Sequence, residues 1–387
     1  MYAQELYNNY FNTFGSVNEA NEIVSIDRGS KLSAVFTAIN GIAQDVAKLP
    51  IDVCKDSREG GKDKYRNHYV YKLINQAPNE YMGAFNFWYT MIFNALREGS
   101  TALIIRENGI PTQLIPFQYD SIGRSKDGSV FYSYKGQQIP DRDVLSLKMY
   151  TFDGITPVSP ITWNAELMGY RMKVRKYASK VIGTNGNGFI SSEGISQEDG
   201  QIIAKNMKEA IAKGEIPFMG SSGKTTWNRQ LITPEEGQYL ETAKKGDRDI
   251  FAIYRYPNAL GGDLENGTYS NTEQQDLVYA KYTLTPWARL IEDEINRKLF
   301  TEANKVAQYP YYSLYDFRAM LKGDLNSRKE YYQVMKDGIM SADEIREMEG
   351  LPPLPEGKGK YVYTQGANKK LGEEEVVESI KNDNEDE

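Results

Sequence analysis

The chain has 387 residues but only one cysteine, Cys54, and one histidine, His68. A single cysteine excludes an internal disulfide and a cysteine-rich metal site, and a single histidine excludes a site with two histidine ligands. Cys54 ends an apolar, strand-like run and is expected to be a packed thiol, whereas His68 has polar neighbours and is expected to be exposed. We therefore predict no metal or other cofactor, and little remains for a catalytic triad.

Long apolar runs are also missing. No stretch reaches the length of a membrane span, and the first residues have neither the basic region nor the apolar core of a signal peptide. We therefore expect no membrane partner, and a protein that works in a reducing cytoplasm or in a particle assembled there.

An excess of positive charge is absent as well. The net charge is −7, and the segment 372–387 alone carries eight acids and one lysine, so the rest of the chain is close to neutral. A neutral body does not grip phosphates as basic nucleic-acid binders do. It fits a conduit in which DNA slides, and it fits equally a protein that never meets DNA. The acidic segment itself is predicted to be disordered.

Helical spacing of apolar residues is the first positive signal. It predicts helices over 27–49 and 84–97, and a third helix that Ser159 caps with Pro160 at its first position. The predicted apolar face of the third helix consists of Trp163, Leu167, Tyr170, Val174, Tyr177 and Val181. This stripe suits either an ordinary helical core or packing against neighbouring copies in a ring.

Turn signals separate strands between residues 101 and 148. Asn108-Gly109 and Asp127-Gly128 are typical of hairpin turns, and Lys135-Gly136 predicts a further break. These turns predict antiparallel strands. Residues 1–26 show no clear periodicity and are interpreted as an arm.

The middle of the chain reads as a small insertion between two helices. Ser196 is expected to cap a helix through Lys213, and 216–219 and 225–227 are expected to flank a glycine turn. Thr233-Pro234-Glu235-Glu236 then predicts the start of a helix that runs to about Tyr254.

A Gly/Asn-rich loop that leads into a long helix is the most informative pattern. The helix has apolar residues every three or four positions and contains Pro286. A proline removes a backbone donor and clashes with the preceding turn, so a kink is expected near Tyr282. The candidate loop residues are Asn258, Gly261, Gly262, Asp263, Glu265, Asn266 and Gly267. Such a loop at the head of a bent helix suggests a lever or a channel lining.

The order of several short motifs resembles the portal proteins of tailed phages. The resemblance covers residues 35 to 355. Its matching segments are Pro78-Asn79-Glu80-Tyr81-Met82, 99–106, 154–161, Tyr269-Ser270-Asn271-Thr272-Glu273-Gln274, Thr283-Leu284-Thr285-Pro286, Ile291-Glu292, 337–341, Glu344-Ile345-Arg346 and Gly350-Leu351-Pro352-Pro353-Leu354.

The resemblance implies an α+β, portal-like fold with an antiparallel β wing, long stem and tunnel helices and a helical crown. Its parts are an arm and wing (1–158), a stem helix (159–185), a clip (186–232), a second stem helix (233–257), a tunnel loop (258–268), a kinked tunnel helix (269–305), wing strands (306–324), a crown (325–371) and an acidic tail (372–387). It further implies a homo-oligomeric ring, commonly of twelve copies, at one capsid vertex of the virion, assembled in the host cytoplasm. The implied partners are double-stranded DNA in the channel, the terminase large subunit, the major capsid protein and head–tail connector proteins.

Three motifs imitate catalytic or metal sites, but a purely structural interpretation fits each of them better. The segment 219–226 resembles a phosphate-binding loop, but Phe218 replaces its first glycine and a strand is expected at Thr225. The carboxylates of Glu235/Glu236 and of Asp293/Glu294 point in different directions on a helix. Asp263, Glu265 and Asn266 lack the spacing of a calcium loop. We predict no enzyme and no metal site.

Basic residues on the first stem helix are candidates for contact with the capsid shell or with DNA. They are Arg171, Arg175, Lys176 and Lys180. A solvated helix face is the simpler interpretation. Two other functions stay open at this stage, another head–tail adaptor ring and, from a different class, a nucleotide-driven DNA-processing enzyme.

Overall fold

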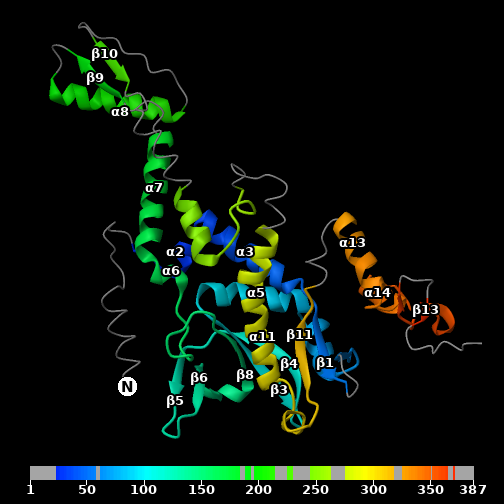
Figure 1. Cartoon of the computed structure of the whole chain (residues 1–387). Coiled ribbons are helices and arrows are strands. Elements are labelled where there is room, and N and C mark those ends of the chain that lie inside the picture. The colour runs from blue at the N-terminus through cyan, green and yellow to red at the C-terminus, as the bar shows by residue number, and fades with distance from the viewer. Residues whose placement is uncertain are drawn as a thin grey trace, which may run out of the picture.

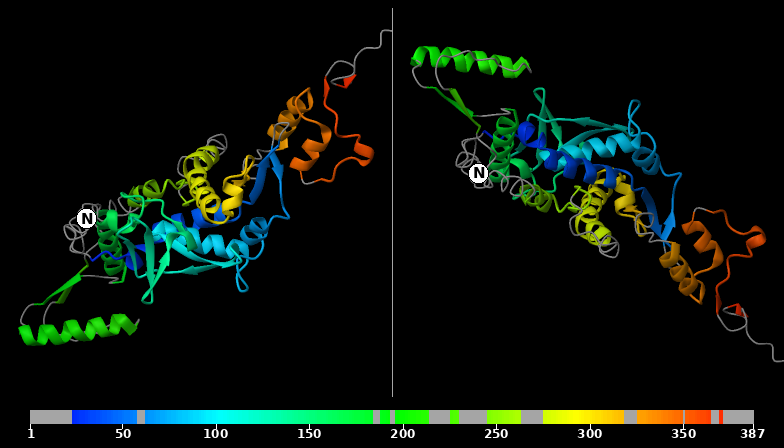
Figure 2. Two further views of the ribbon diagram at one scale, coloured as in Figure 1. Left: turned by 90° about the horizontal axis from the view of Figure 1, so that it is seen from below. Right: turned by 90° about the horizontal axis from the view of Figure 1, so that it is seen from above.

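The computed structural model places a mixed helical and β body between two projecting ends (Figure 1). From the body, α7 (Ala165–Gly183) extends to a small unit at one end, and the C-terminal helices lie at the other end (Figure 2). The structure describes residues 23–57, 62–183, 188–192, 196–213, 225–229, 245–262, 275–317, 325–349, 351–364 and 369–370.

Two packed helices, α3 (Ser33–Ala47) and α5 (Ala84–Arg97), form the centre of the body. The bounds of α5 agree with the sequence prediction, whereas the predicted helix 27–49 is divided into α2 (Ile26–Ser30) and α3. The division lies at Lys31 and Leu32. Gly29 in α2 packs closely against a distant segment, since an added Cβ would sit 2.2 Å from Cγ2 of Ile161. Such a contact has no local signal in the sequence.

The body has a three-stranded sheet that joins the two halves of the chain. In the order β11-β1-β2, β1 (Ile51–Asp56) pairs antiparallel with β11 (Tyr311–Tyr315), and Ile51 lies opposite Tyr315. The third strand is β2 (Lys62–Lys64). Cys54 in β1 is buried, as predicted.

The region 100–147 consists of antiparallel strands, as the turn signals predicted. Asn108, Gly109, Gly128, Lys135 and Gly136 all have positive φ, the conformation that tight hairpin turns require. One sheet has the order β4-β3-β8 and the other the order β5-β6-β7. The strands are β3 (Ser100–Glu107), β4 (Ile110–Phe117), β5 (Ser121–Arg124), β6 (Val130–Tyr134), β7 (Gln137–Pro140) and β8 (Val144–Leu147), with a 3₁₀ turn at Asp141–Asp143.

The predicted helix after Ser159 is two helices. Pro160 begins α6 (Pro160–Trp163), and the chain turns at Asn164 before α7. The Ser159 side chain makes no capping hydrogen bond, contrary to the prediction. The predicted apolar face is also wrong in part, because Trp163 and Tyr170 are exposed while Met168 and Met172 are buried. The thioethers therefore provide the packing that the aromatic rings were expected to provide.

The small distal unit contains one helix and a two-stranded sheet. The hydroxyl of Ser196 accepts a hydrogen bond from the amide of Asp199, 3.2 Å away, and so caps α8 (Gln197–Lys213), as predicted. The strand β10 (Thr225–Arg229) pairs with β9 (Gly188–Ser192), whereas the other expected strand, 216–219, lies outside the described residues. Residues 214–224 and 230–244, which include most of the phosphate-loop-like motif and the pair Glu235/Glu236, lie outside the described residues.

The long helix that contains Pro286 ends at Lys298, earlier than the predicted 305. It is described from 275 onward and passes through a π-helical turn, Ala280–Leu284, into α11 (Thr285–Lys298). The residues up to 305 form a separate short helix, α12 (Glu302–Lys305), capped by Thr301. The preceding helix is described over 245–254.

The C-terminal part is mainly helical, and Ser341 and Glu344 form a capping box at the start of α14 (Ala342–Met348). Its last α-helix ends at Met348, before Pro352. Pro355–Gly357 forms a 3₁₀ turn, and the acidic tail lies outside the described residues. The elements are α13 (Leu325–Lys336), α14 (Ala342–Met348), β12 (Tyr363–Thr364) and β13 (Lys369–Lys370).

The only histidine, His68, is a structural group and is not exposed as expected. Its Nδ1 accepts a hydrogen bond from the amide of Val70, 3.2 Å away, and caps α4 (Tyr69–Asn75). Its ring lies between the rings of Phe300 and Tyr311, with centroids 5.5 and 4.8 Å away. Partial burial lowers the pKa of His68 below its usual value.

Candidate functional site

The π-helical turn Ala280–Leu284 is the first part of the candidate site. It lies immediately before Pro286, where the sequence predicted a kink. The amide of Thr285 donates to the carbonyl of Ala280, five residues back, and the Thr285 hydroxyl donates to the same oxygen at 2.8 Å. A wide turn accommodates the proline ring, which clashes with the carbonyl four residues earlier in a regular helix. The local change is thus a wider turn within a continuous helix, since Leu284 and Thr285 keep α-helical φ and ψ.

Arg255 supplies the hydrogen bond that Pro286 cannot supply. In a regular helix the amide of residue 286 would donate to the carbonyl of Tyr282, but proline has no such amide. The Arg255 guanidinium donates to this oxygen at 3.4 Å. In return, the Thr283 hydroxyl donates to the Arg255 carbonyl at 2.7 Å. These two reciprocal bonds join the end of the helix 245–254 to the π-helical turn.

The base of the candidate loop is held close to the same helix. Arg255 ends the helix with a φ of 51°, and a cleft then lies between this end and the π-helical turn. A Cβ on Gly261 would lie 2.3 Å from the Phe251 ring, so this position requires glycine. Gly262 follows with a φ of 93°, a second glycine requirement. Asn258 lines the cleft, whereas Asp263, Glu265, Asn266 and Gly267 lie outside the described residues.

A buried tyrosine fixes the π-helical turn to the central helix α3. The Tyr279 hydroxyl donates to Oδ2 of Asp45 at 2.9 Å. Burial, with the Asp45 carboxylate beside it, raises the pKa of Tyr279. The Tyr256 ring meets the Tyr279 ring edge-on, with centroids 5.8 Å apart. Hence one side of the turn is attached to rigid parts of the body.

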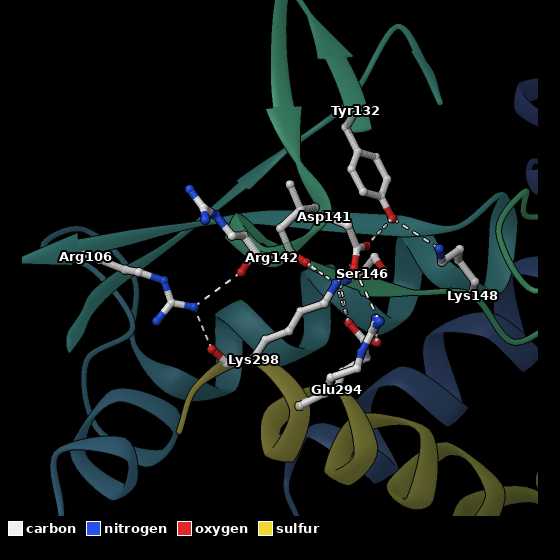
Figure 3. Close-up of polar contacts among 10 residues, drawn as sticks. Arg106, Tyr132, Asp141, Arg142, Ser146, Lys148, Glu294 and Lys298 are labelled. Carbon is white, nitrogen blue, oxygen red and sulfur yellow. Dashed lines mark hydrogen bonds and ion pairs between the residues drawn. The ribbon is translucent and has the colours of Figure 1, made fainter. Parts of the chain in front are cut away.

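The opposite end of α11 is held by a buried ion-pair network (Figure 3). The Lys298 ammonium, whose side chain is 2% exposed, lies 3.0 Å from a carboxylate oxygen of Asp141 and 3.0 Å from one of Glu294. Glu294 also accepts a hydrogen bond from the Ser146 amide at 3.2 Å. Because Asp141 and Ser146 belong to the β region, the network joins α11 to the sheets.

Further groups complete this anchor. Arg106 in β3 donates to the Lys298 carbonyl at 2.6 Å and so satisfies a group at the C-terminal end of α11. The Lys148 ammonium donates to the Tyr132 hydroxyl at 3.1 Å, and burial lowers the pKa of Lys148 and raises that of Tyr132. Figure 3 shows these side chains converging from the strands onto the end of the helix.

The same helix is also bonded to the three-stranded sheet. An oxygen of Glu292 accepts from the Tyr315 amide at 2.7 Å, and Asn296 accepts from the Ser313 amide at 2.7 Å. Burial raises the pKa of Glu292. The C-terminal half of α11 is therefore fixed on two sides, while the wide turn beside the loop base lies at the N-terminal end of α11.

The basic candidate residues on α7 do not form a single free face. Arg171 pairs with Asp247 of the helix 245–254 and is mostly enclosed. Arg175 donates to the Lys31 carbonyl at 3.4 Å, and Lys176 is exposed. The side chain of Lys180 lies outside the described part of the chain. At least Arg171 therefore holds two helices of this chain together.

Of the two acidic pairs singled out in the sequence, only Asp293 and Glu294 lie within the described residues. Glu294 is buried in the anchor, while its neighbour Asp293 is exposed and pairs with Arg289. Among the described residues, no group of three His, Cys, Asp or Glu side chains is placed to hold a metal ion. Within the same residues, no helix is long and apolar enough to cross a membrane.

Comparison with known proteins identifies the family. The sequence model of the family described as "Phage portal protein" matches residues 33–350. The chain is 24% identical over 387 residues to the "Probable portal protein" of Streptomyces phage phiC31, which covers 92% of this chain and 83% of the phage protein. It is 24% identical over 352 residues to the "Portal protein" of Enterobacteria phage HK97, with 86% and 82% covered.

A solved structure supports the fold independently. A chain in the "Neck of native GTA particle computed with C12 symmetry" matches with a TM-score of 0.55 at 17% identity, and the match covers 84% of this chain and 91% of that chain. Together with the family match, this similarity confirms the α+β portal fold.

Proposed function

The chain belongs to the phage portal protein family, and on that premise we propose that twelve copies close into a ring at one capsid vertex, through which double-stranded DNA is packaged and later ejected. The function as a capsid portal of a phage follows from the family, since the match spans most of the chain. The ring size rests on the related neck with C12 symmetry.

The observation that carries the proposal is the unequal attachment of the long helix. Its C-terminal half is fixed to two sheets. Its N-terminal end is held on one side by the bond from Tyr279 to Asp45, and it meets the loop through a wide turn and the Arg255 bonds. A loop carried on such an end can yield to passing DNA while the helix keeps its place. We therefore assign to 258–268 the role of a tunnel loop and to 275–298 that of a tunnel helix.

We further propose which parts meet the partners. The distal unit with α8, β9 and β10 projects from the body on α7 (Figure 1), which suits a clip that docks the terminase large subunit and later the head–tail connector proteins. The exposed Arg175 and Lys176 on α7 are candidates for contact with the major capsid protein. We assign no catalytic step to the chain.

Electron microscopy of the purified protein tests the ring. We expect closed rings with a central hole, and native mass spectrometry should give a mass of twelve chains. Monomers or dimers alone, at all salt and protein concentrations, would contradict the proposal. A purified protein that hydrolyses ATP, and loses this activity in Lys224→Ala, would favour a DNA-processing enzyme instead.

A further inference from the structure

A strip of aromatic rings crosses the outer side of α3 and α5. Phe85, Tyr89 and Phe93 follow one another at intervals of four residues along α5, and Phe36 of α3 continues the strip. The ring centroids are 6.3 Å apart from Phe85 to Tyr89, 5.7 Å from Tyr89 to Phe93 and 6.2 Å from Phe93 to Phe36. The strip is therefore continuous.

Both ends of this strip face solvent, since Phe36 is 50% and Phe85 is 47% exposed. Tyr89 and Phe93 between them are partly buried against the core. The Tyr89 hydroxyl donates to Asn40 at 2.9 Å, so its polar end is satisfied within the chain. Contiguous exposed aromatic surface is uncommon on soluble proteins and marks sites of interaction.

A second apolar surface lies on the opposite side of the body. Phe36 and Asp45 are nine residues apart, which is two and a half helical turns, so they point in opposite directions from α3. Asp45 is bonded to Tyr279 of the long helix. Both views of Figure 2 show α3 (dark blue) between α5 (cyan) and the long helix (yellow). On the outside of that helix, Leu277 is 56%, Val278 55% and Tyr282 51% exposed.

We propose that the aromatic strip of one copy packs against Leu277, Val278 and Tyr282 of the next copy in the ring. This inference rests on the proposed ring. A closed ring needs head-to-tail contacts between two different surfaces on opposite sides of each subunit, and these two surfaces have that arrangement. The neck with C12 symmetry formed by a structurally similar chain makes a second copy the partner favoured here.

The contact has a consequence for the loop. Tyr282 belongs to the π-helical turn, and the carbonyl of Tyr282 accepts the hydrogen bond from Arg255. If the neighbour's rigid helix pair rests on this turn, the position of one tunnel loop depends on the adjacent subunit. The aromatic rings form the centre of a larger contact, because a stable interface buries about 800 Å² on each partner.

Cross-linking tests the pairing. Cys54 is the only cysteine and is 1% exposed, so introduced cysteines are the only accessible ones. Phe85→Cys and Leu277→Cys are introduced together, and the protein is treated with a short bis-maleimide. We expect a ladder of covalent oligomers that extends to the full ring. Each single variant should remain uncross-linked, because each ring contact contains one residue of each kind.

The controls separate this inference from the proposed function. Rings that form while the double variant gives no ladder would overturn the inference and leave the function intact. Covalent dimers of Phe85→Cys alone would also overturn it, because the strip would then contact itself. A protein that forms no ring in native mass spectrometry would overturn both.

A second pair of variants tests the energetic role. Phe36→Ser with Phe85→Ser should raise the protein concentration needed for half-assembly by about tenfold or more, while the monomer keeps its melting temperature. Val306→Ser is the matched control, since Val306 is 85% exposed on another surface, and it should assemble normally. Normal rings in the strip variant that fail only to enter capsids would instead assign the strip to the shell protein and overturn the inference.

Discussion

The guanidinium of Arg255 lies 3.4 Å from the carbonyl oxygen of Tyr282, the group that Pro286 leaves without its helical donor. Two residues 27 positions apart thus complete one hydrogen bond of a helix. The same arginine ends the preceding helix with a positive φ. The helix 245–254 and the long helix are in this way joined at the base of the candidate loop.

The first prediction concerns the return bond from Thr283 to Arg255. Thr283→Val keeps the shape of the side chain but leaves the Arg255 carbonyl without this donor. We expect a loss of about 1 kcal/mol of stability and faster amide exchange over 275–284. Thr285→Val is the control, because the Thr285 hydroxyl bonds only to its own helix. Equal exchange in the two variants would show that the bond does not hold the turn.

The second prediction concerns the buried anchor. Lys298→Met leaves the carboxylates of Asp141 and Glu294 without their buried cation. We expect a loss of about 3–5 kcal/mol, visible as a marked fall in melting temperature. Arg297→Met is the neighbouring control and should cost about 1 kcal/mol or less, since the Arg297 side chain is 55% exposed. Similar melting temperatures for both variants would contradict a central role for Lys298.

The third prediction concerns acid stability. His68 must be neutral for its Nδ1 to accept from Val70, and burial lowers its pKa below the usual 6.5. The unfolded chain therefore takes up a proton before the folded one, and stability falls as the pH drops below about 6.5 toward the lowered pKa. His68→Asn keeps a capping oxygen without titrating. Its melting temperature should depend less on pH in that window, and an unchanged pH dependence would exclude His68 as the cause.

Elements that depend only on residues close together in the sequence could be predicted from local patterns. The hairpin turns at Asn108-Gly109 and Asp127-Gly128, the bounds of α5 and the capping box at Ser341 all follow from short-range geometry. The close contact of Gly29 with Ile161 and the pairing of β9 with β10 join segments that are distant in sequence. Such features have no signal in a single sequence.

The same distinction between local and distant causes applies to the residues of the candidate site. Pro286 marked the place of the wide turn because its effect acts within one helical turn. Arg255 and the pair Lys298 and Asp141 were missed, since the last two are 157 positions apart and meet only in the fold. The spacing of Glu294 and Lys298, four residues apart, was a readable signal for one ion pair of the anchor.

The motifs behind the family resemblance now have physical roles. In the segment 283–286, Thr283 bonds the stem helix and Thr285 closes the wide turn. Glu292 ties the helix to β11, and the buried Asn79 donates to the Leu114 carbonyl at 2.8 Å. Each of these residues makes a specific hydrogen bond within the fold, which composition alone does not reveal.

The fourth prediction concerns the helix at Pro286. Pro286→Ala restores a backbone donor, so the Tyr282 carbonyl gains a helical partner and no longer needs Arg255. We expect the π-helical turn to become regular, which rotates the residues before it relative to α11 by part of a turn and displaces the loop base. A structure of the variant ring checks this directly. A ring that keeps the wide turn would show that Arg255 and Thr283 impose it without the proline.

The last prediction concerns the loop itself. Gly261 packs against Phe251 and Gly262 has positive φ, so both belong to the rigid base, and a deletion should begin after them. Removing 263–267 should leave ring formation and melting temperature unchanged, because the residues that pack at the base remain. Filled heads should be fewer, or should lose their DNA, since the shortened loop no longer reaches the DNA.

A further variant replaces 263–267 by a loop of equal length built from glycine and serine. It separates the effect of loop length from the effect of loop charge. It lacks Asp263 and Glu265 but spans the same distance. If the loop contacts DNA sterically, this variant should package and retain DNA as the unaltered protein does, measured by the DNA content of purified heads. A failure equal to that of the deletion would mean that the acidic side chains act on the DNA. Heads that fill and hold full-length DNA in both variants would reduce the loop to a connector, and the fixed helix behind it would then support the channel wall alone.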